Sequence, residues 1–196
     1  AGMYMWLSNG LAALAKMGGQ VNVGHALGAS NSEEAAEYAS NALQLTLTLG
    51  IIYGLVCILG AKPLIHFFHL NQAQVIRDAI YYLEITCGLV LFSFLNQTYT
   101  GLFTAIGNSR PVFLATTTGL VVNIILDPVL IFGIGPFPEL GVSGAAAATV
   151  TAQALVSLLF FKAVLREKVL FPHLRLWVLV PVKVWREIVR IGVPSA

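Results

Sequence analysis

Long apolar segments alternate with short polar ones along the whole chain. The apolar segments cover residues 3–26, 41–67, 79–106, 111–134 and 141–163. About 20 helical residues cross a hydrocarbon core of about 30 Å, so each segment is long enough to span a bilayer. The segments are continuously apolar instead of alternating with a period of two, which is typical of membrane helices. The pattern predicts an all-α polytopic membrane protein.

The polar segments carry signals for helix starts and connections. In "SNSEEA", Ser30 or Asn31 can cap a helix whose first turn holds Glu33 and Glu34. After residue 163 the chain becomes amphipathic and basic ("VLREKVLFPHLRLWVLVPVKVWREIVR"), which indicates a connecting loop with an interfacial helix. A sixth apolar segment begins near the end, at "IGVPSA". We therefore expect a fragment with five full spans and the start of a sixth.

Composition excludes a soluble globular domain. Hydrophobic residues make up 57% of the chain and charged residues only 10%, with a mean hydropathy of +0.81. Soluble domains carry about 25% charged residues, because a folded domain of this size needs a polar surface. The lipid bilayer is therefore the partner that the composition demands, in a multi-pass arrangement.

The basic residues are distributed unevenly between the two sides of the predicted bundle. If the spans alternate, eight of the eleven lysines and arginines share one side: Arg110, Lys162, Arg166, Lys168, Arg175, Lys183, Arg186 and Arg190. Only Lys62 and Arg77 are on the other. The positive-inside rule makes the basic side cytoplasmic, and we expect the plasma membrane, the inner membrane of a bacterium. Lys16 falls inside the first span and has no explanation at this level.

Motifs for other kinds of chemistry are missing from the sequence. It contains no P-loop, nucleic-acid motif, paired-cysteine zinc pattern, G-x-S-x-G or H-E-x-x-H. Cys57 and Cys87 lie in apolar runs, as small core residues do. We expect no enzyme, no cofactor and no nucleic-acid partner.

Asp127 is the residue with the strongest claim to a function. It lies in "NIILDPVLIFG", about 24 Å along a helix that begins at Pro111. A charge inside a span costs about 2.5–3.5 kcal/mol on insertion scales, so such residues mark functional sites by default. Asn123 shares its helix face, and Pro128 frees the carbonyl of Ile124. These oxygens suit Na⁺ or a proton relay; the alternative is a carboxyl that only packs.

Other polar residues in the spans admit two interpretations. Gly144 and Ala148 permit close approach of a neighbouring helix. Beyond them, Thr149, Thr151 and Gln153 offer polar groups, although a Thr149 hydroxyl bonded to its own helix is an equal alternative.

The end of the third span carries the polar patch "NQTYTG", preceded by Phe92 and Phe94. It could line a cavity for an amphipathic cation, through cation–π contacts, or could simply pack. The residues we consider for such a cavity are Gln20, Asn96, Gln97, Tyr99 and Gln153. Asn22 shares the ambiguity of Gln20, Glu84 is most simply interfacial, and His66 and His69 are most simply solvated near an interface.

Two stretches resemble the multidrug and toxic compound extrusion (MATE) transporters. They are "GGQVNVGHALGASNSEEAAEYASNALQL" and "GLFTAIGNSRPVFLATTTGLVVNIILDPVLIFGIGPFPELGVSGAAAATVTAQ". The resemblance extends over essentially the whole chain and implies a twelve-helix antiporter of two six-helix lobes. It assigns residues 1–163 to helices two to six of the N-lobe, 164–186 to the inter-lobe loop, and 187–196 to the start of helix seven. Helix one and the C-lobe would be the missing partners.

The resemblance also implies roles for particular residues. Asn123, Asp127 and Thr149 match the positions of the cation- or proton-coupling site in the family, and Asp127 in place of asparagine resembles the DinF-like branch. The implied function is secondary active export of small organic cations in exchange for H⁺ or Na⁺. Asp127 and Asn123 would hold the ion when it is Na⁺. In the family an aspartate on helix one faces this site, and it is not in this chain.

Two alternatives to an exporter stay open. A flippase of lipid-linked sugars from the same superfamily would need a cluster of basic residues in its cavity, and only Lys16 lies well within a span. A non-catalytic membrane assembly subunit is the other alternative.

Overall fold

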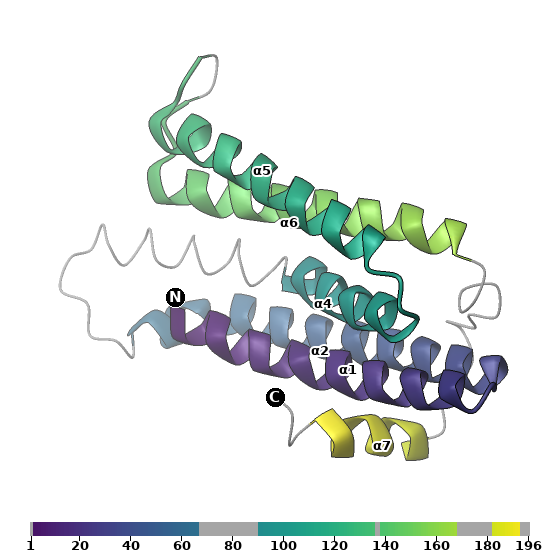
Figure 1. The fold of residues 1–196 in the computed structure, drawn as a ribbon. Coiled ribbons are helices and arrows are strands. Elements are labelled where there is room, and N and C mark those ends of the chain that lie inside the picture. The colour runs from purple at the N-terminus through teal and green to yellow at the C-terminus, as the bar shows by residue number, and fades with distance from the viewer. Residues whose placement is uncertain (1, 67–89, 136–137, 168–181, 193–196) are drawn as a thin grey trace.

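Every segment that the computed structural model describes in regular secondary structure is helical (Figure 1). The described residues are 2–66, 90–135, 138–167 and 182–192, and no strand occurs within them. The helices are α1 (Gly2–Gly28), α2 (Ser32–His66), α4 (Val90–Ala105), α5 (Arg110–Phe132), α6 (Gly141–Arg166) and α7 (Val182–Gly192).

The helices form layers. The hairpin of α1 and α2 makes one layer, and α4 packs on both of its helices. The hairpin of α5 and α6 lies on the far side of α4, held there mainly through α6, while α7 lies against α1 on the opposite outer face (Figure 1). Helix α5 packs almost entirely on α6 and makes few contacts with α4. The α5–α6 hairpin therefore joins the α1–α2 hairpin through α6 and α4, and α4 lies between the two hairpins.

The predicted spans agree with the helices to different degrees. Spans 3–26, 111–134 and 141–163 agree with α1, α5 and α6 to within three residues at each end. The second helix begins at Ser32, well before residue 41, because Asn31 caps it as the sequence predicted. The Asn31 Oδ1 atom accepts the Glu34 backbone N–H at 3.2 Å, and its Nδ2 atom donates to the Glu34 carboxylate at 2.9 Å.

Some of the expectations fall on residues that the structure does not describe. The first part of the third span, with Glu84 and Cys87, lies outside the described residues, as do His69 and Arg77. So does much of the predicted 164–186 loop, while α7 runs across the predicted boundary at residue 187. Cys57 is buried, 2% exposed, as expected of a small core residue.

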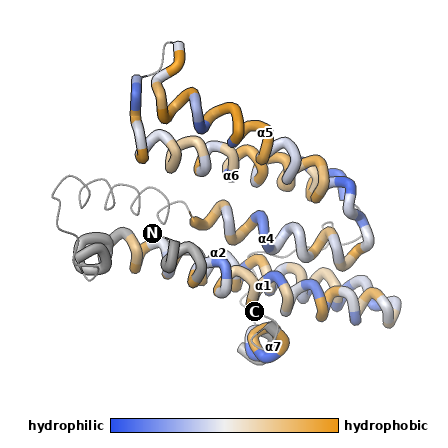
Figure 2. The backbone as a smooth tube through the Cα atoms, turned by 60° about the vertical axis from the view of Figure 1, so that its left-hand side comes forward, coloured by the Kyte–Doolittle hydropathy of each residue, from blue (hydrophilic) through white to orange (hydrophobic). Residues whose placement is uncertain are grey.

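Three of the described helical segments are long and apolar enough to cross a membrane: Ser32–Cys57, Arg110–Phe132 and Gly141–Arg166. The described part of α4 has 16 residues, and α1 carries the polar residues Asn9, Lys16, Gln20 and Asn22. The strongly apolar character of α5 is visible in Figure 2. The chain is a multi-pass, all-α membrane protein, as the sequence predicted.

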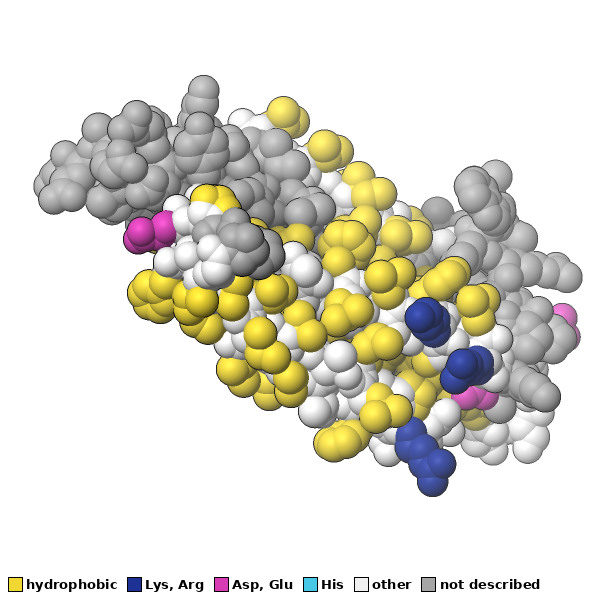
Figure 3. All heavy atoms as spheres, turned by 90° about the horizontal axis from the view of Figure 1, so that it is seen from above, with side chains coloured by type: hydrophobic (Ala, Val, Ile, Leu, Met, Phe, Trp, Pro, Cys, Tyr) yellow, Lys and Arg dark blue, Asp and Glu magenta, His cyan; other side chains and the backbone are white. Residues whose placement is uncertain are grey.

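The outer face of the α5–α6 hairpin is apolar with a charged end. Leu114 and Ile125 of α5 are 63% and 57% exposed, as side chains facing lipid would be. Arg110 begins α5, and Lys162 and Arg166 lie at the end of α6, so these cations share one end of the hairpin; Figure 3 shows basic side chains gathered at one end of this face. Glu139 lies in the turn at the other end.

Close approach of the α5 and α6 backbones depends on glycine. A Cβ atom at Gly144 would lie 2.4 Å from the carbonyl oxygen of Leu130, and one at Gly119 would lie 2.3 Å from Val156 Cγ2. Ala148 is fully buried on the same helix as Gly144. The prediction that Gly144 lets a neighbouring helix approach closely is confirmed, and the neighbour is α5.

Helix α7 is amphipathic, as the basic segment predicted. Ile188 is fully buried and packs with Ala15, Ala42 and Leu45, while Arg186 is exposed. The contact is tight at α1, because a Cβ atom at Gly18 would lie 2.2 Å from the carbonyl oxygen of Ile188.

We expect Gly144→Ala to destabilise the full-length protein by about 1–3 kcal/mol, because the methyl group must push the Leu130 backbone away. Gly24→Ala is the matched control. Nothing lies within 4 Å of a Cβ atom at Gly24, which is also inside a helix, so the higher helix propensity of alanine makes that change neutral or stabilising. Thermal unfolding of the purified protein in detergent measures both. Equal melting temperatures for the two variants would contradict the packing described here.

Candidate functional site

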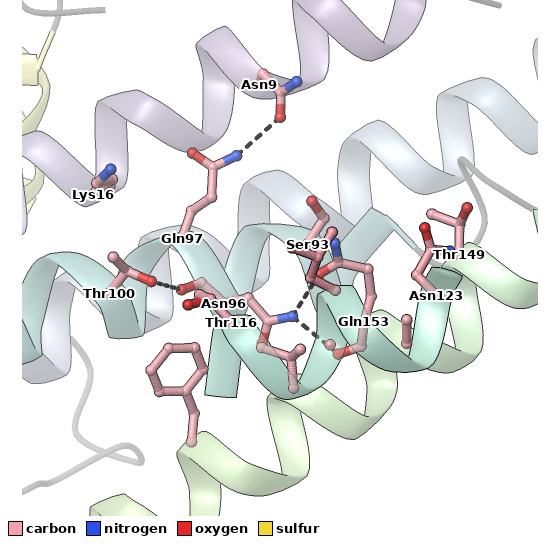
Figure 4. Close-up of a pocket in the computed structure, with 15 residues that line it drawn as sticks. Asn9, Lys16, Ser93, Asn96, Gln97, Thr100, Thr116, Asn123, Thr149 and Gln153 are labelled. Carbon is pink, nitrogen blue, oxygen red and sulfur yellow. Dashed lines mark hydrogen bonds between the residues drawn. The ribbon is translucent and has the colours of Figure 1, made fainter. Parts of the chain in front are cut away.

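A polar cavity of about 440 Å³ lies between the two hairpins (Figure 4). Helices α1, α4, α5 and α6 all contribute to its wall. The lining residues are Asn9, Lys16, Ser93, Asn96, Gln97, Thr100, Thr116, Gly119, Leu120, Asn123, Thr149, Ala152, Gln153, Val156 and Phe160. Its volume is in the range of small-molecule binding sites, which is about 300–1,000 Å³.

The lining follows the helical period on each helix. On α4 the residues are Ser93, Asn96, Gln97 and Thr100, which recur at intervals of three and four. The lining residues of α5 and α6 follow the same spacing, and the two from α1 lie two turns apart. One face of each helix therefore points into the same space.

The cavity carries little charge. Among the described residues that line it, Lys16 is the only one with a charged side chain; the others are amides, hydroxyls, glycine and apolar groups. Lys16 has no hydrogen-bond or ion-pair partner within the described part of the chain.

Asn96 forms the centre of a hydrogen-bond network that joins α4 to α6. Its Nδ2 atom donates to the backbone carbonyl of Gln153 at 2.9 Å and to Gln153 Oε1 at 2.7 Å, and Ser157 donates to Asn96 Oδ1 at 2.7 Å. On the other side of α4, Gln97 Nε2 donates to Asn9 Oδ1 at 3.0 Å (Figure 4). The cavity wall is therefore held by amides that bridge three helices.

Asp127 lies beside the cavity without lining it. It is half-buried on α5, and its Oδ1 atom accepts a 3.4 Å hydrogen bond from Nδ2 of Asn123, one turn earlier. Asn123 and Thr149 do line the cavity. The Thr149 hydroxyl donates to Ala145 of its own helix at 3.0 Å, which is the alternative considered for it. The structure thus joins Asp127 to the cavity through one amide.

Pro128 follows Asp127 inside α5, and the helix continues to Phe132, where Gly133 ends it in the left-handed conformation (φ 65°). The Ile124 carbonyl receives no bond from Pro128, since proline has no N–H. The contact that the structure gives the Asp127 carboxylate is the Asn123 amide N–H. Within the described ranges no group of three or more His, Cys, Asp or Glu residues could hold a metal.

Three of the five residues expected to line a substrate cavity do so: Asn96, Gln97 and Gln153. The structure has Gln20 and Tyr99 elsewhere. Tyr99 packs between two apolar clusters, with its ring 5.8 Å from that of Phe160, and the Cβ atom of Gln20 lies against Gly101.

The pair of phenylalanines on which the cation–π argument depended does not line the cavity. Phe94 is 1% exposed and stacks on Tyr53, with ring centroids 6.0 Å apart, and Phe92 is not among the lining residues. The aromatic residue of the described lining is Phe160 of α6, and the polar lining consists of amides, hydroxyls and Lys16.

Several lining residues were missed by reasoning from individual motifs: Asn9, Lys16, Ser93 and Thr116. The signal that could have found them is the three- and four-residue spacing of polar residues along otherwise apolar helices. Lys16 stood out in the sequence as a charge inside a span. The sequence alone does not show which other helices lie beside it, so it could not be assigned to the cavity lining.

Comparison with known proteins gives a consistent result. The MatE family model matches residues 3–129. A FAD transporter of Shewanella oneidensis is 35% identical over 135 residues, which are 67% of this chain and 29% of that protein. A probable multidrug resistance protein NorM of Thermotoga maritima is 31% identical over 199 residues, 97% of this chain and 41% of that protein.

Solved structures agree with these relatives. A crystal structure of MATE in complex with MaD3S superposes with a TM-score of 0.85 at 26% identity, over 99% of this chain and 44% of that one. An inward-facing multidrug resistance MATE transporter gives 0.84 at 24% identity. The chain spans less than half the length of these proteins.

We expect Asn96→Leu to destabilise the full-length protein by about 1–3 kcal/mol, because it removes the bonds to Gln153 and Ser157 and leaves buried polar groups without partners. Thr118→Val is the control, since that exposed hydroxyl bonds only to Leu114 of its own helix. Thermal unfolding in detergent, followed by tryptophan fluorescence, compares the two. The network is not what joins α4 to α6 if Asn96→Leu melts no earlier than the control.

Proposed function

The chain belongs to the MatE family of multidrug and toxic compound extrusion proteins, and from that premise we propose that it forms part of a secondary active exporter. The exporter moves small molecules out across a bacterial inner membrane in exchange for H⁺ or Na⁺. No covalent bond is made or broken in this process. The observation that carries the proposal is a cavity with polar lining residues between apolar helices, with a half-buried carboxylate one amide away.

Asp127 is the proposed coupling residue. An ionised carboxylate within an apolar helix is unstable without a partner, and binding H⁺ or Na⁺ removes that uncompensated charge. Because Asn123 both bonds to Asp127 and lines the cavity, a change at the carboxylate alters the cavity wall directly. An ion that binds one conformation more tightly than the other shifts the equilibrium between them, which is sufficient for coupling.

The choice between H⁺ and Na⁺ depends on how many oxygens reach the ion. A proton needs only the Asp127 carboxylate, whereas Na⁺ needs several oxygens at once. Asn123 Oδ1 and the Ile124 carbonyl supply two, with Thr149 as a third candidate on α6. The Thr149 hydroxyl hydrogen is used within its own helix, so its oxygen can still act as a ligand.

Two classes of cargo follow from the family and its members. Organic cations are the class that the family resemblance implies. The relative named as a FAD transporter is 35% identical to this chain and supports an alternative, a large anionic cofactor. A flippase for lipid-linked sugars fits less well, because the described lining has one cation and no basic cluster.

We expect Asp127→Asn to abolish gradient-driven transport by the full-length protein in proteoliposomes, with a loss of at least about tenfold. Asparagine can still accept the bond from Asn123, so the fold should persist. Glu139→Gln removes an exposed carboxylate from the turn after the same helix and should have no effect. Ethidium, norfloxacin and FAD serve as a cationic, a zwitterionic and an anionic cargo, each tested under a ΔpH and under a Na⁺ gradient.

The gradient that drives the wild-type protein identifies the ion. Gradient-driven transport that survives in Asp127→Asn would make this carboxylate a packing residue. A wild-type protein that moves none of the three cargoes under either gradient would contradict the exporter itself.

A further inference from the structure

Lys16 lies near the middle of the membrane-spanning part of the bundle. Helices α1 and α2 run antiparallel, and a Cβ atom at Gly19 would lie 2.7 Å from Ala42 Cβ. One turn earlier on α1, Ala15 packs with Ala42 and Leu45. Lys16 is therefore level with the centre of the apolar stretch Ser32–Cys57.

Lys16 cannot reach water by extending its side chain along the helix. Both ends of α1 are about 18–21 Å from its Cα atom along the helix axis, at about 1.5 Å per residue, and a lysine side chain covers only about a third of that distance. Its stem packs at Gly101, where a Cβ atom would be 3.0 Å from Lys16 Cγ. Lys16 is thus packed against α4 at its base and lines the cavity.

The positive charge of Lys16 is uncompensated within the described part of the chain. No described residue forms an ion pair with it, and none of the other described lining residues is charged. A cation in the interior of a membrane protein is unfavourable without a partner and normally marks a substrate or ion site.

Two neighbouring amides also present hydrogen-bond donors. Asn9 Oδ1 accepts from Gln97, and Gln153 Oε1 accepts from Asn96. The NH₂ groups of Asn9 and Gln153 have no acceptor within the described residues, and both residues line the cavity. Asn9 and Lys16 lie two turns apart on one face of α1. N–H donors and an ammonium group that line one cavity suit a carboxylate or a phosphate.

We propose that Lys16 anchors an anionic group of the cargo, so that this cavity selects small amphipathic organic anions carrying a carboxylate or phosphate. The inference rests on the proposed function, because it names the cargo class of the same cavity. The ammonium pairs with the anionic group, and Asn9 and Gln153 donate hydrogen bonds to the cargo. Gln97 Oε1 is an acceptor for its polar uncharged part.

The Asp127 carboxylate does not lie against an anionic cargo, so it does not repel the cargo at close range. Asp127 is not part of the lining, and its near oxygen accepts a bond from Asn123. The ion therefore acts on the cavity through α5, while Lys16, on α1, determines the charge of the cargo.

The test is equilibrium binding to the purified full-length protein in detergent, with no gradient. Fluorescein, an anion, and rhodamine 123, a cation with the same ring system, are followed by fluorescence anisotropy. The variants are Lys16→Gln, Lys16→Arg and, as a matched control, Lys162→Gln, which removes an exposed lysine at the end of α6. Asp127→Asn is measured beside them.

We expect the wild-type protein to bind fluorescein more tightly than rhodamine 123. Lys16→Gln should weaken fluorescein binding by roughly ten- to a hundredfold, the size of one charge-assisted contact, without weakening rhodamine 123 binding. Lys16→Arg should keep most of the affinity, and Lys162→Gln all of it.

The inference is wrong if the wild-type protein prefers rhodamine 123 or binds neither dye. It is also wrong if Lys16→Gln and Lys162→Gln bind fluorescein equally, as expected if Lys16 pairs with a carboxylate from another segment. If Lys16→Gln does not fold, the preference of the wild-type protein between the two dyes decides the question. Since no gradient is used, a protein that binds anions but does not transport would refute the exporter and leave this inference standing.

Discussion

The low polarity of the surroundings is the constraint on which the rest of this structure depends. A polar side chain on a membrane-spanning helix loses its bonds to water, so it must find partners on its own helix or on a neighbouring one. Short hydroxyl side chains solve this locally: Thr48, Thr116 and Thr151 each donate to a carbonyl four residues earlier. An amide has more donors and acceptors than one such carbonyl can satisfy, although Asn22 does donate to the Gly18 carbonyl of its own helix at 2.9 Å. Asn96 therefore requires Gln153 and Ser157 from another helix, and this requirement determines where α4 and α6 meet.

The bundle can satisfy those amides only because its backbones approach closely elsewhere. Gly119 and Gly144 bring α5 against α6, and Gly101 brings α4 against the backbone of Lys16. Alanines fill much of the interface between α1 and α2, and the hydroxyls of Thr46 and Thr98 lie 2.6 Å apart between α2 and α4. Small residues thus hold the layers together on their apolar faces. The longer polar side chains remain on the faces that diverge, and a cavity results from that division.

Much of the fold followed from the sequence, while less of the site did. The apolar segments, the Asn31 cap and the small residues at Gly144 and Ala148 are local features, and local features depend on few neighbours. Cavity lining depends on which faces of four helices converge, so Tyr99 was assigned to the cavity although its ring packs on Phe160. Lys16 is the clearest case. Its charge was evident in the sequence, but its meaning depended on Gly101 and on the absence of a carboxylate from the described lining.

The proposed function of the site depends on keeping the charges of Asp127 and Lys16 apart. Asp127 on α5 and Lys16 on α1 lie on helices that the layers keep apart, and only Asn123 links the carboxylate to the shared space. If both charges lined the cavity, they would pair with each other, and a buried ion pair binds neither a proton nor a cargo readily. Asp127 lies one helical turn beyond Asn123 and outside the cavity lining. Its carboxylate therefore stays available to an ion, and the Lys16 ammonium stays available to a ligand. Pro128 directly follows Asp127 and has no N–H for the Ile124 carbonyl. The carbonyl that loses this bond therefore belongs to the same part of α5 as Asp127, and the donors Asn9 and Lys16 belong to α1.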